Sequence, residues 1–78
     1  MKILTINQIS ESLEIVNLTE EETERILSVE EPLDQYYVSG DILTEHGYFT
    51  QEPGFTWMIG EEFPVYDDKH DNEPIMFL

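Results

Sequence analysis

Carboxylates are the side chains with the most chemistry in this sequence, and they form two dense runs. Glu20, Glu21 and Glu22 are consecutive, and a second acidic run extends from Asp67 to Glu73. Carboxylates at such spacing can bind a cation, exchange protons as an acid–base pair, or present negative charge to a basic partner. The surrounding residues favour the third of these roles.

The run from Asp67 to Glu73 departs from a calcium-binding loop in two ways. Lys69 stands where an oxygen ligand is needed, and no glycine lies at the centre of the run to allow the sharp turn. We therefore interpret this run as a solvated hairpin loop. No metal and no other cofactor is expected.

Catalysis needs a nucleophile or an acid–base group that a second group orients, and no such pattern occurs here. The chain contains no phosphate-binding glycine loop, no nucleophile elbow and no His-Glu-x-x-His motif. His46 and His70 lie in turn-like segments without a nearby partner pattern, which is typical of surface histidines. A chain of 78 residues also offers little room for a substrate cleft. We expect that the protein is not an enzyme.

Net charge narrows the classes of partner. Eighteen acidic residues face only Lys2, Arg25 and Lys69, which leaves a formal charge of −15. So few basic groups cannot offset phosphate repulsion, which excludes direct nucleic-acid binding. The hydrophobic fraction of 40% predicts a folded chain despite its self-repulsion. Three uses for the charge remain: solubility, including in a halophilic cytoplasm, recognition of a basic protein, and replacement of DNA phosphates on such a protein.

The cellular setting follows from what the sequence lacks. It contains no cysteine, which fits a reducing compartment. No apolar run approaches the roughly 18 residues of a membrane span, and the apolar stretch in residues 1–7 is too short for a signal peptide. We expect a cytoplasmic protein with no membrane partner.

The first third of the chain predicts two strands and a helix within one domain, residues 1–78. Residues 2–7 alternate loosely and predict a strand, with an irregular arm over residues 2–10 as the alternative. Residues 12–16 alternate more clearly, which predicts a strand with two apolar side chains on one face. Those two side chains are Leu13 and Ile15.

A helix is predicted next. Thr19 and Glu22 match a capping box, and three glutamates suit the first turn of a helix from Glu20 to about Ser28. Pro32 prevents much extension beyond that point. One face of this helix should pack on a sheet, and its members are Thr23, Ile26 and Leu27.

From Gln35 onward the pattern predicts β-structure. Strand formers and turn signals alternate, and His46-Gly47 marks either a tight turn or a kink within a strand. We therefore expect an α+β fold with an antiparallel sheet of about four to five strands packed against one or two short helices. The predicted strand segments are residues 36–38, 42–50, 55–59, 64–66 and 74–78.

The order of these segments resembles phage-type uracil-DNA glycosylase inhibitors, which are small acidic α+β proteins that mimic DNA. The resemblance rests on Glu11-Ser12-Leu13 before a short strand, with Leu13 where those proteins have isoleucine, and on the acidic helix Thr19 to Leu27. Asp41-Ile42-Leu43 would open a strand of the meander that follows. Met76-Phe77-Leu78 would close the last hairpin. About two thirds of the chain matches in order and type.

The resemblance implies a partner-binding site with two parts. Glu11, Ser12 and Leu13 would lie along the DNA-binding cleft of the glycosylase, and Glu20 or Glu21 would act as a further phosphate mimic. That family also encloses an apolar side chain of the enzyme in a pocket between helix and sheet. Here the pocket would be lined by Val16, Thr23, Ile26, Leu27 and Met58.

The leading hypothesis is therefore an inhibitor that occupies the DNA-binding cleft of a basic DNA-binding protein, with uracil-DNA glycosylase as the first named target. The same mimicry could be aimed at a restriction enzyme, a CRISPR effector or a nuclease. A different class, an acidic adaptor that meets an ordinary protein partner, predicts an exposed apolar patch and binding that tolerates salt.

Overall fold

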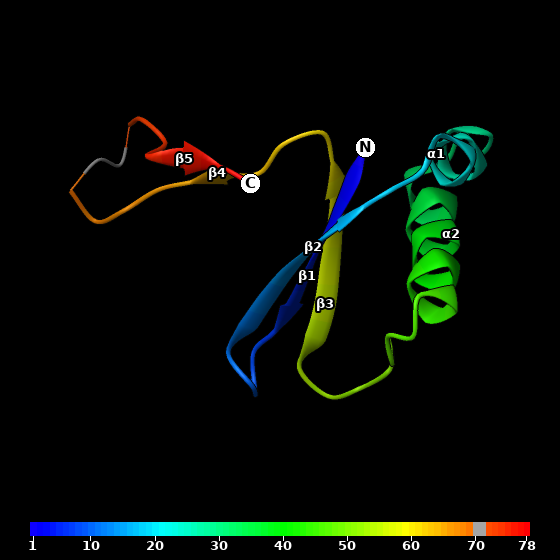
Figure 1. Ribbon diagram of the computed structural model, residues 1–78, viewed down its shortest axis with the longest axis horizontal. Coiled ribbons are helices and arrows are strands. Elements are labelled where there is room, and N and C mark those ends of the chain that lie inside the picture. The colour runs from blue at the N-terminus through cyan, green and yellow to red at the C-terminus, as the bar shows by residue number, and fades with distance from the viewer. Residues whose placement is uncertain (70–71) are drawn as a thin grey trace.

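The computed structural model describes residues 1–69 and 72–78 and has an α+β fold (Figure 1). Two strands lead into two helices, and a third strand then returns to the first sheet before a small C-terminal hairpin. His70 lies outside the described residues. In chain order the elements are β1 (Lys2–Asn7), β2 (Ser12–Asn17), α1 (Glu20–Leu27), α2 (Pro32–Glu45), β3 (Phe55–Gly60), β4 (Pro64–Val65) and β5 (Met76–Phe77).

The main sheet has three antiparallel strands in the order β2-β1-β3. The predicted strands over residues 2–7 and 12–16 are confirmed, and the alternative of an irregular arm is wrong. Asn7 closes the turn between β1 and β2, since its side-chain Oδ1 accepts hydrogen bonds of 3.0 Å from the backbone N–H groups of Ile9 and Ser10. In the strand order β2-β1-β3, β2 is an edge strand.

Alternation along β1 divides the sheet into a helix-facing side and an open side. Ile3 is fully buried on the helix-facing side, where it pairs with Val16 and packs with Leu43 of α2. The intervening residues, Leu4 and Ile6, point to the open side. In Figure 1 both helices lie on one side of the sheet, so the core sits between β1 and α2.

The predicted capping box starts α1. The backbone N–H of Glu22 donates to Thr19 Oγ1 over 3.1 Å, and the backbone N–H of Thr19 donates to Glu22 Oε1 over 2.9 Å. The helix ends at Leu27 with Ser28 as its C-cap. Of the predicted apolar face, Ile26 is fully buried, whereas Leu27 is 58% exposed.

The largest correction concerns α2, because residues 36–38 and residues 42–45 of the predicted strand 42–50 are helical, and residues 46–50 form no strand. Pro32 begins this helix at its first turn, where proline costs no hydrogen bond, and so does not merely limit the previous one. Burial then falls at helical spacing on Ser39, Gly40 and Leu43, which turn toward the sheet. Packing of this face outweighs the local preference of Tyr36-Tyr37-Val38 for a strand.

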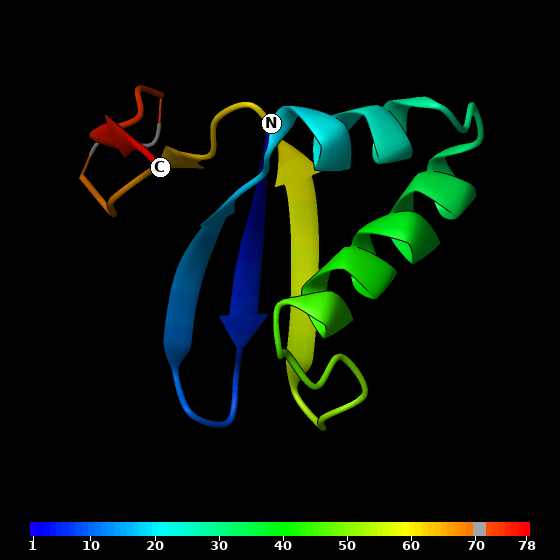
Figure 2. The same cartoon turned by 45° about the vertical axis from the view of Figure 1, so that its right-hand side comes forward.

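The C-terminal hairpin forms a separate two-stranded sheet. The predicted single sheet of four to five strands is therefore wrong in count, because β4 and β5 pair with each other and not with β3. Phe63 anchors the hairpin: its backbone exchanges hydrogen bonds of 3.0 and 2.8 Å with Leu78, and its ring packs beside Gly60 at the end of β3. Figure 2 shows the hairpin beside the main sheet and away from both helices.

No helix within the described residues has the length and apolar character to cross a membrane.

Candidate protein-interaction surface

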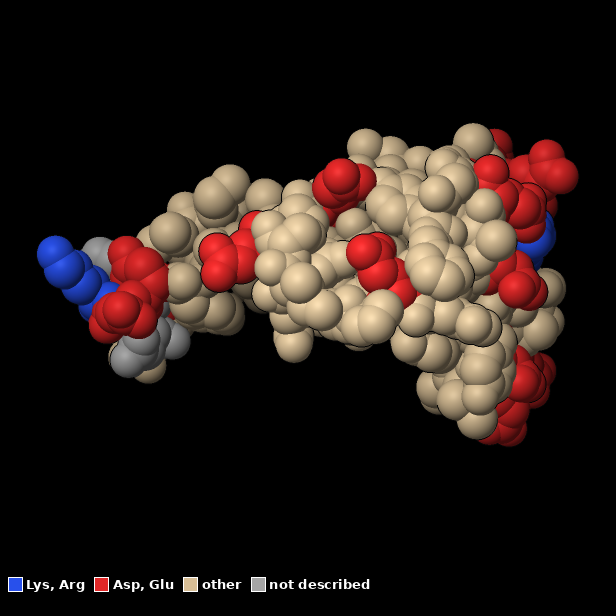
Figure 3. Space-filling view, turned by 90° about the horizontal axis from the view of Figure 1, so that it is seen from below, with Lys and Arg blue, Asp and Glu red and all other residues tan. Residues whose placement is uncertain are grey.

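Exposed carboxylates gather on the outer side of the two helices. Figure 3 shows them along the edge of the molecule that α1 and α2 form. We call this surface the helix acidic face. It comprises Glu20, Glu21, Glu24, Glu30, Glu31, Asp34, Asp41 and Glu45, all of them exposed.

Arg25 is the only basic residue in the segment from Glu20 to Glu45, and a carboxylate of the same face engages it. Its Nη1 and Nη2 donate to Glu45 Oε1 and Oε2 over 3.0 and 2.8 Å. This bidentate salt bridge raises the pKa of Arg25 and lowers the pKa of Glu45. The pair joins the last turn of α1 to the end of α2.

Glu22 makes a second link between the helices. Its Oε2 lies 2.6 Å from Nε2 of His46, the C-cap of α2. The backbone N–H of Thr19 and then the His46 ring lower the pKa of the Glu22 carboxyl. His46 is thus not the partnerless surface histidine that the sequence predicted. The missing signal was α2 itself, because only that helix brings His46 back to the start of α1.

The two predicted groups of phosphate mimics lie at opposite ends of β2. Glu11 is exposed in the turn before the strand, with a φ of 55°, and Ser12 shares a hydrogen bond of 2.8 Å with Ser10. Glu20 and Glu21 begin α1 after the strand ends. A six-residue strand spans about 20 Å, so these groups do not form one compact cluster. Glu20 and Glu21 belong to the helix acidic face, and Glu11 does not.

The five residues of the predicted apolar pocket do not surround one space. Val16 and Ile26 are buried in the core, where neighbouring side chains occupy the volume. Met58 pairs with Leu4 and therefore lies on the open side of the sheet, with 50% of its surface exposed. Leu27 is exposed on α1 and Thr23 is half-buried. The structure therefore does not bring the five residues together between helix and sheet.

A polar cavity of about 380 Å³ lies at the turn end of the helix-facing side. Its lining includes Ser12, Glu14 and Tyr48. The Tyr48 hydroxyl donates to the Glu14 carboxylate, and this hydrogen bond raises the pKa of Tyr48. Sequence reasoning missed this pair because the two residues are 34 positions apart and come from a strand and a loop.

The open side of the sheet is largely apolar and partly exposed, and we call it the open sheet face. Leu13 is 60% exposed there and Met58 is 50% exposed. Among the described strand residues of this face there is no carboxylate, and Lys2 is its charged member. The other members are Leu4, Ile6, Ile15, Asn17, Thr56 and Gly60.

Comparison with known proteins adds no relative: no family model, no curated protein and no solved structure matches this chain.

Within residues 1–69 and 72–78, no group of three or more His, Cys, Asp or Glu side chains could hold a metal ion. The described features are therefore a rigid acidic surface on two helices and an apolar surface on the opposite side of the sheet.

Proposed function

We propose that this protein is a DNA mimic, which binds the DNA-binding surface of a basic enzyme through the helix acidic face and thereby inhibits it. The observation that carries the proposal is the density of carboxylates on α1 and α2. Eight exposed carboxylates lie on α1, on α2 and in the segment between them, and the single basic residue of this segment of the chain is already held by Glu45. A surface of this kind attracts the positive groove that normally binds phosphates.

Rigidity supports the same proposal. The capping box orders the start of α1, and the Arg25–Glu45 and Glu22–His46 contacts connect the two helices. Carboxylates held on connected helices lose less conformational entropy when they meet a partner than carboxylates on a mobile loop. The face is therefore suited to specific binding as well as to the long-range electrostatic attraction of a basic partner.

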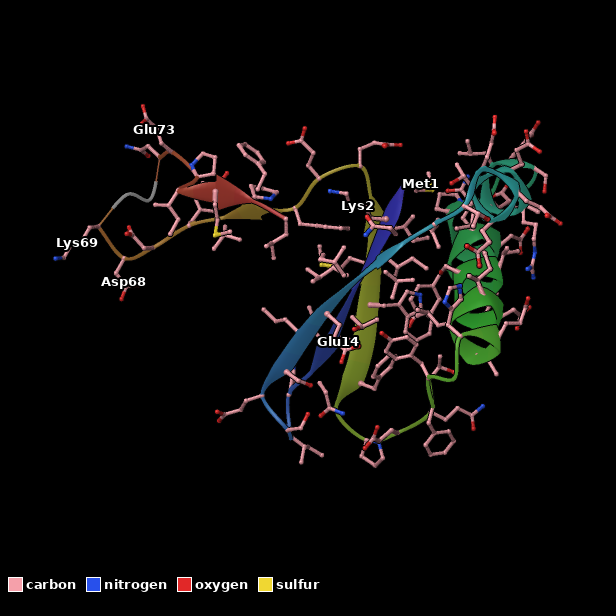
Figure 4. All side chains as sticks on the ribbon, in the orientation of Figure 1. Met1, Lys2, Glu14, Asp68, Lys69 and Glu73 are labelled. Carbon is pink, nitrogen blue, oxygen red and sulfur yellow. The ribbon has the colours of Figure 1, made fainter. Side chains whose placement is uncertain are left out.

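Charge spacing is also compatible with a nucleic-acid backbone. The 14 residues of α2 extend for about 21 Å, and carboxylates one turn apart lie about 5–6 Å from each other. Glu20 and Glu24 have this spacing on α1, as do Asp41 and Glu45 on α2. Negative charges thus recur along both helices. The remaining basic residues are distant, since Figure 4 shows Lys2 on the sheet and Lys69 at the far end of the hairpin.

Uracil-DNA glycosylase is the first target to test. The part of the resemblance that supports this choice is an edge strand opened by Glu11-Ser12-Leu13 and followed closely by an acidic helix. Asp41-Ile42-Leu43 no longer contributes, because these residues lie in α2. Restriction enzymes, CRISPR effectors and nucleases carry similar basic grooves and form the rest of the test panel.

The open sheet face favours a second candidate, an acidic adaptor that meets a protein partner through apolar contacts. Its exposed Leu13 and Met58 lie on a face without carboxylates, which suits an apolar and uncharged partner surface. Such binding would persist at high salt, unlike binding through the helix acidic face.

The two candidates are separated by an inhibition assay. Uracil excision from a uracil-containing duplex by uracil-DNA glycosylase is measured with increasing amounts of this protein, and the rest of the panel is assayed on its own DNA substrates. The proposal predicts inhibition that more duplex DNA relieves. Two results together would favour the adaptor. No enzyme in the panel is inhibited, and the protein binds another protein in a salt-resistant way that Leu13→Asp abolishes.

The decisive control compares two variants that change the net charge by the same amount. The triple variant Glu20→Gln, Glu24→Gln, Glu31→Gln removes three charges from the helix acidic face. The triple variant Glu62→Gln, Asp68→Asn, Glu73→Gln removes three exposed charges elsewhere. The proposal predicts that inhibition is lost mainly in the first variant, and equal losses would reduce the effect to net charge alone.

A further inference from the structure

A pocket with aromatic walls lies beside the helix acidic face, between α2 and β3. Its volume is about 310 Å³, and residues 50 and 51 of the connecting loop complete it. The residues that matter for its chemistry are Tyr36, Tyr37, Gly40, Asp41, Thr44 and Trp57. Five of these six come from α2, at spacings that place them along one side of the helix.

The aromatic wall is fixed by hydrogen bonds and close packing. The Trp57 indole N–H donates to Ser39 Oγ over 2.8 Å, and the ring stacks on Tyr36 with a centroid distance of 4.4 Å and an interplanar angle of 4°. Gly40 permits this position, because a Cβ there would lie 3.0 Å from the indole. The pocket therefore exists before any partner arrives.

The chemistry of the lining selects a cation. Tyr37 is 61% exposed and meets Tyr36 edge-on, so its ring is available to a ligand. Asp41 adds an exposed carboxylate, and the described lining contains no Lys or Arg. Aromatic rings attract cations through their negative faces, and a carboxylate beside them adds a charged hydrogen-bond acceptor.

We propose that this pocket receives an arginine side chain of the partner protein. The inference deepens the proposed function, on which it rests, by assigning one recognition site within the larger acidic surface. A guanidinium group is flat and weakly hydrated, so it can stack on a tyrosine ring while its N–H groups donate to Asp41. A lysine ammonium group is more strongly hydrated and cannot stack in this way.

The position of the pocket agrees with this ligand. Asp41 belongs both to the pocket and to the helix acidic face. A basic groove that approaches the face therefore brings its phosphate-binding arginines to the mouth of the pocket. The long-range attraction of the face and the short-range selectivity of the pocket would then act on the same type of side chain.

Trp57 provides a direct reporter, since it is the only tryptophan of the chain. The folded protein is titrated with N-acetyl-L-arginine amide while the Trp57 fluorescence and the indole N–H resonance are followed. The neutral isostere N-acetyl-L-citrulline amide is the matched probe. We expect a saturable change with the arginine probe at millimolar concentration and a much weaker one with the citrulline probe.

Two charge-matched variants locate the binding. Asp41→Asn should weaken the binding of the arginine probe about fivefold, whereas Asp34→Asn on the same helix should leave that binding almost unchanged. Tyr37→Leu, at an exposed position, should also weaken it. Equal binding of both probes, equal effects of the two Asp variants, or no saturable change would overturn the inference.

The result is independent of the inhibition assay. If the arginine probe fails to bind while DNA still competes with the protein for an enzyme, the pocket assignment is wrong and the proposed function stands. If the arginine probe binds at this pocket but no DNA-binding enzyme is inhibited, the pocket stands and the proposed function is wrong.

Discussion

The helix acidic face and the open sheet face carry very different charge. Nine of the eighteen acidic residues fall between Glu20 and Glu45, whereas the described strand residues of the open sheet face include none. A charge kept only for solubility would be expected to cover both sides. The unequal distribution instead indicates that the acidic side is a recognition surface.

The two faces also differ in how they are held. Behind the helix acidic face, α2 packs Ile42 and Leu43 at 0% exposure. The open sheet face has no such layer over Leu13 or Met58. Variants on the two faces can therefore show whether the residues that stabilise the fold differ from the residues that bind a partner.

The largest expected effect is on stability. Ile42→Ala should lower the free energy of unfolding by about 2–5 kcal/mol, because it leaves a cavity beneath α2. Met58→Ala removes a half-exposed side chain and should cost less than about 1 kcal/mol. Urea denaturation followed by circular dichroism measures both values. Similar losses would mean that the open sheet face is covered in solution.

The next effect is on binding by the helix acidic face. The triple variant Glu20→Gln, Glu24→Gln, Glu31→Gln should weaken binding to an inhibited enzyme about 100-fold, mainly through slower association at low salt. Stopped-flow association at several salt concentrations measures this change. A triple variant that associates as fast as the wild type would show that the face plays no part in steering.

A smaller effect should distinguish the two ends of β2. Glu20→Ala should reduce binding by about 1 kcal/mol, because Glu20 lies on the helix acidic face. Glu11→Ala should have less effect, since Glu11 lies at the far end of the strand. Isothermal titration against the same enzyme provides the two affinities. If Glu11→Ala is the more damaging change, the interface follows the edge strand and not the helices.

The smallest effect concerns acid stability and the Glu22–His46 contact. The pKa of Glu22 is lowered in the folded state, so its ionised form stabilises the fold above its ordinary pKa of 4.5. That contribution is lost as pH falls below 4.5 and through the lower folded pKa. Glu22→Gln should therefore be less stable than Glu24→Gln at neutral pH, and the gap should close in acid. Thermal melts between neutral pH and pH 3 measure the gap, and a constant gap would contradict this assignment.

Local signals predicted the elements of the first 28 residues, with an irregular arm as the alternative to β1. Alternation predicted β1 and β2, and the capping box of Thr19 and Glu22 predicted the start of α1. Each of these signals acts between residues that are close in sequence. The membership of Glu20 and Glu21 in an exposed acidic surface followed from the same local pattern.

Local patterns also predicted strands where β3, β4 and β5 lie, whereas α2 and the contacts that it makes depend on packing that sequence patterns do not show. Tyr36 and Val38 favour a strand locally, but the segment that contains them is helical. Ser39 and Gly40 of this helix contact Trp57, which belongs to a later strand. Without α2, neither the Glu22–His46 contact nor the positions of Asp34, Asp41 and Glu45 on the acidic face could be located. Met58 lies apart from the other residues of the predicted pocket, because its side of the sheet depends on pairing with β1.

The most direct test asks whether DNA and this protein bind one enzyme at the same time. Uracil-DNA glycosylase, or whichever panel enzyme is inhibited, is saturated with fluorescent duplex DNA, and this protein is then added. Fluorescence anisotropy and native mass spectrometry follow the release of DNA and the composition of each complex. We predict that each molecule of protein bound releases the DNA and that no ternary complex forms. A stable complex of enzyme, DNA and this protein would contradict the proposal that the helix acidic face takes the place of DNA.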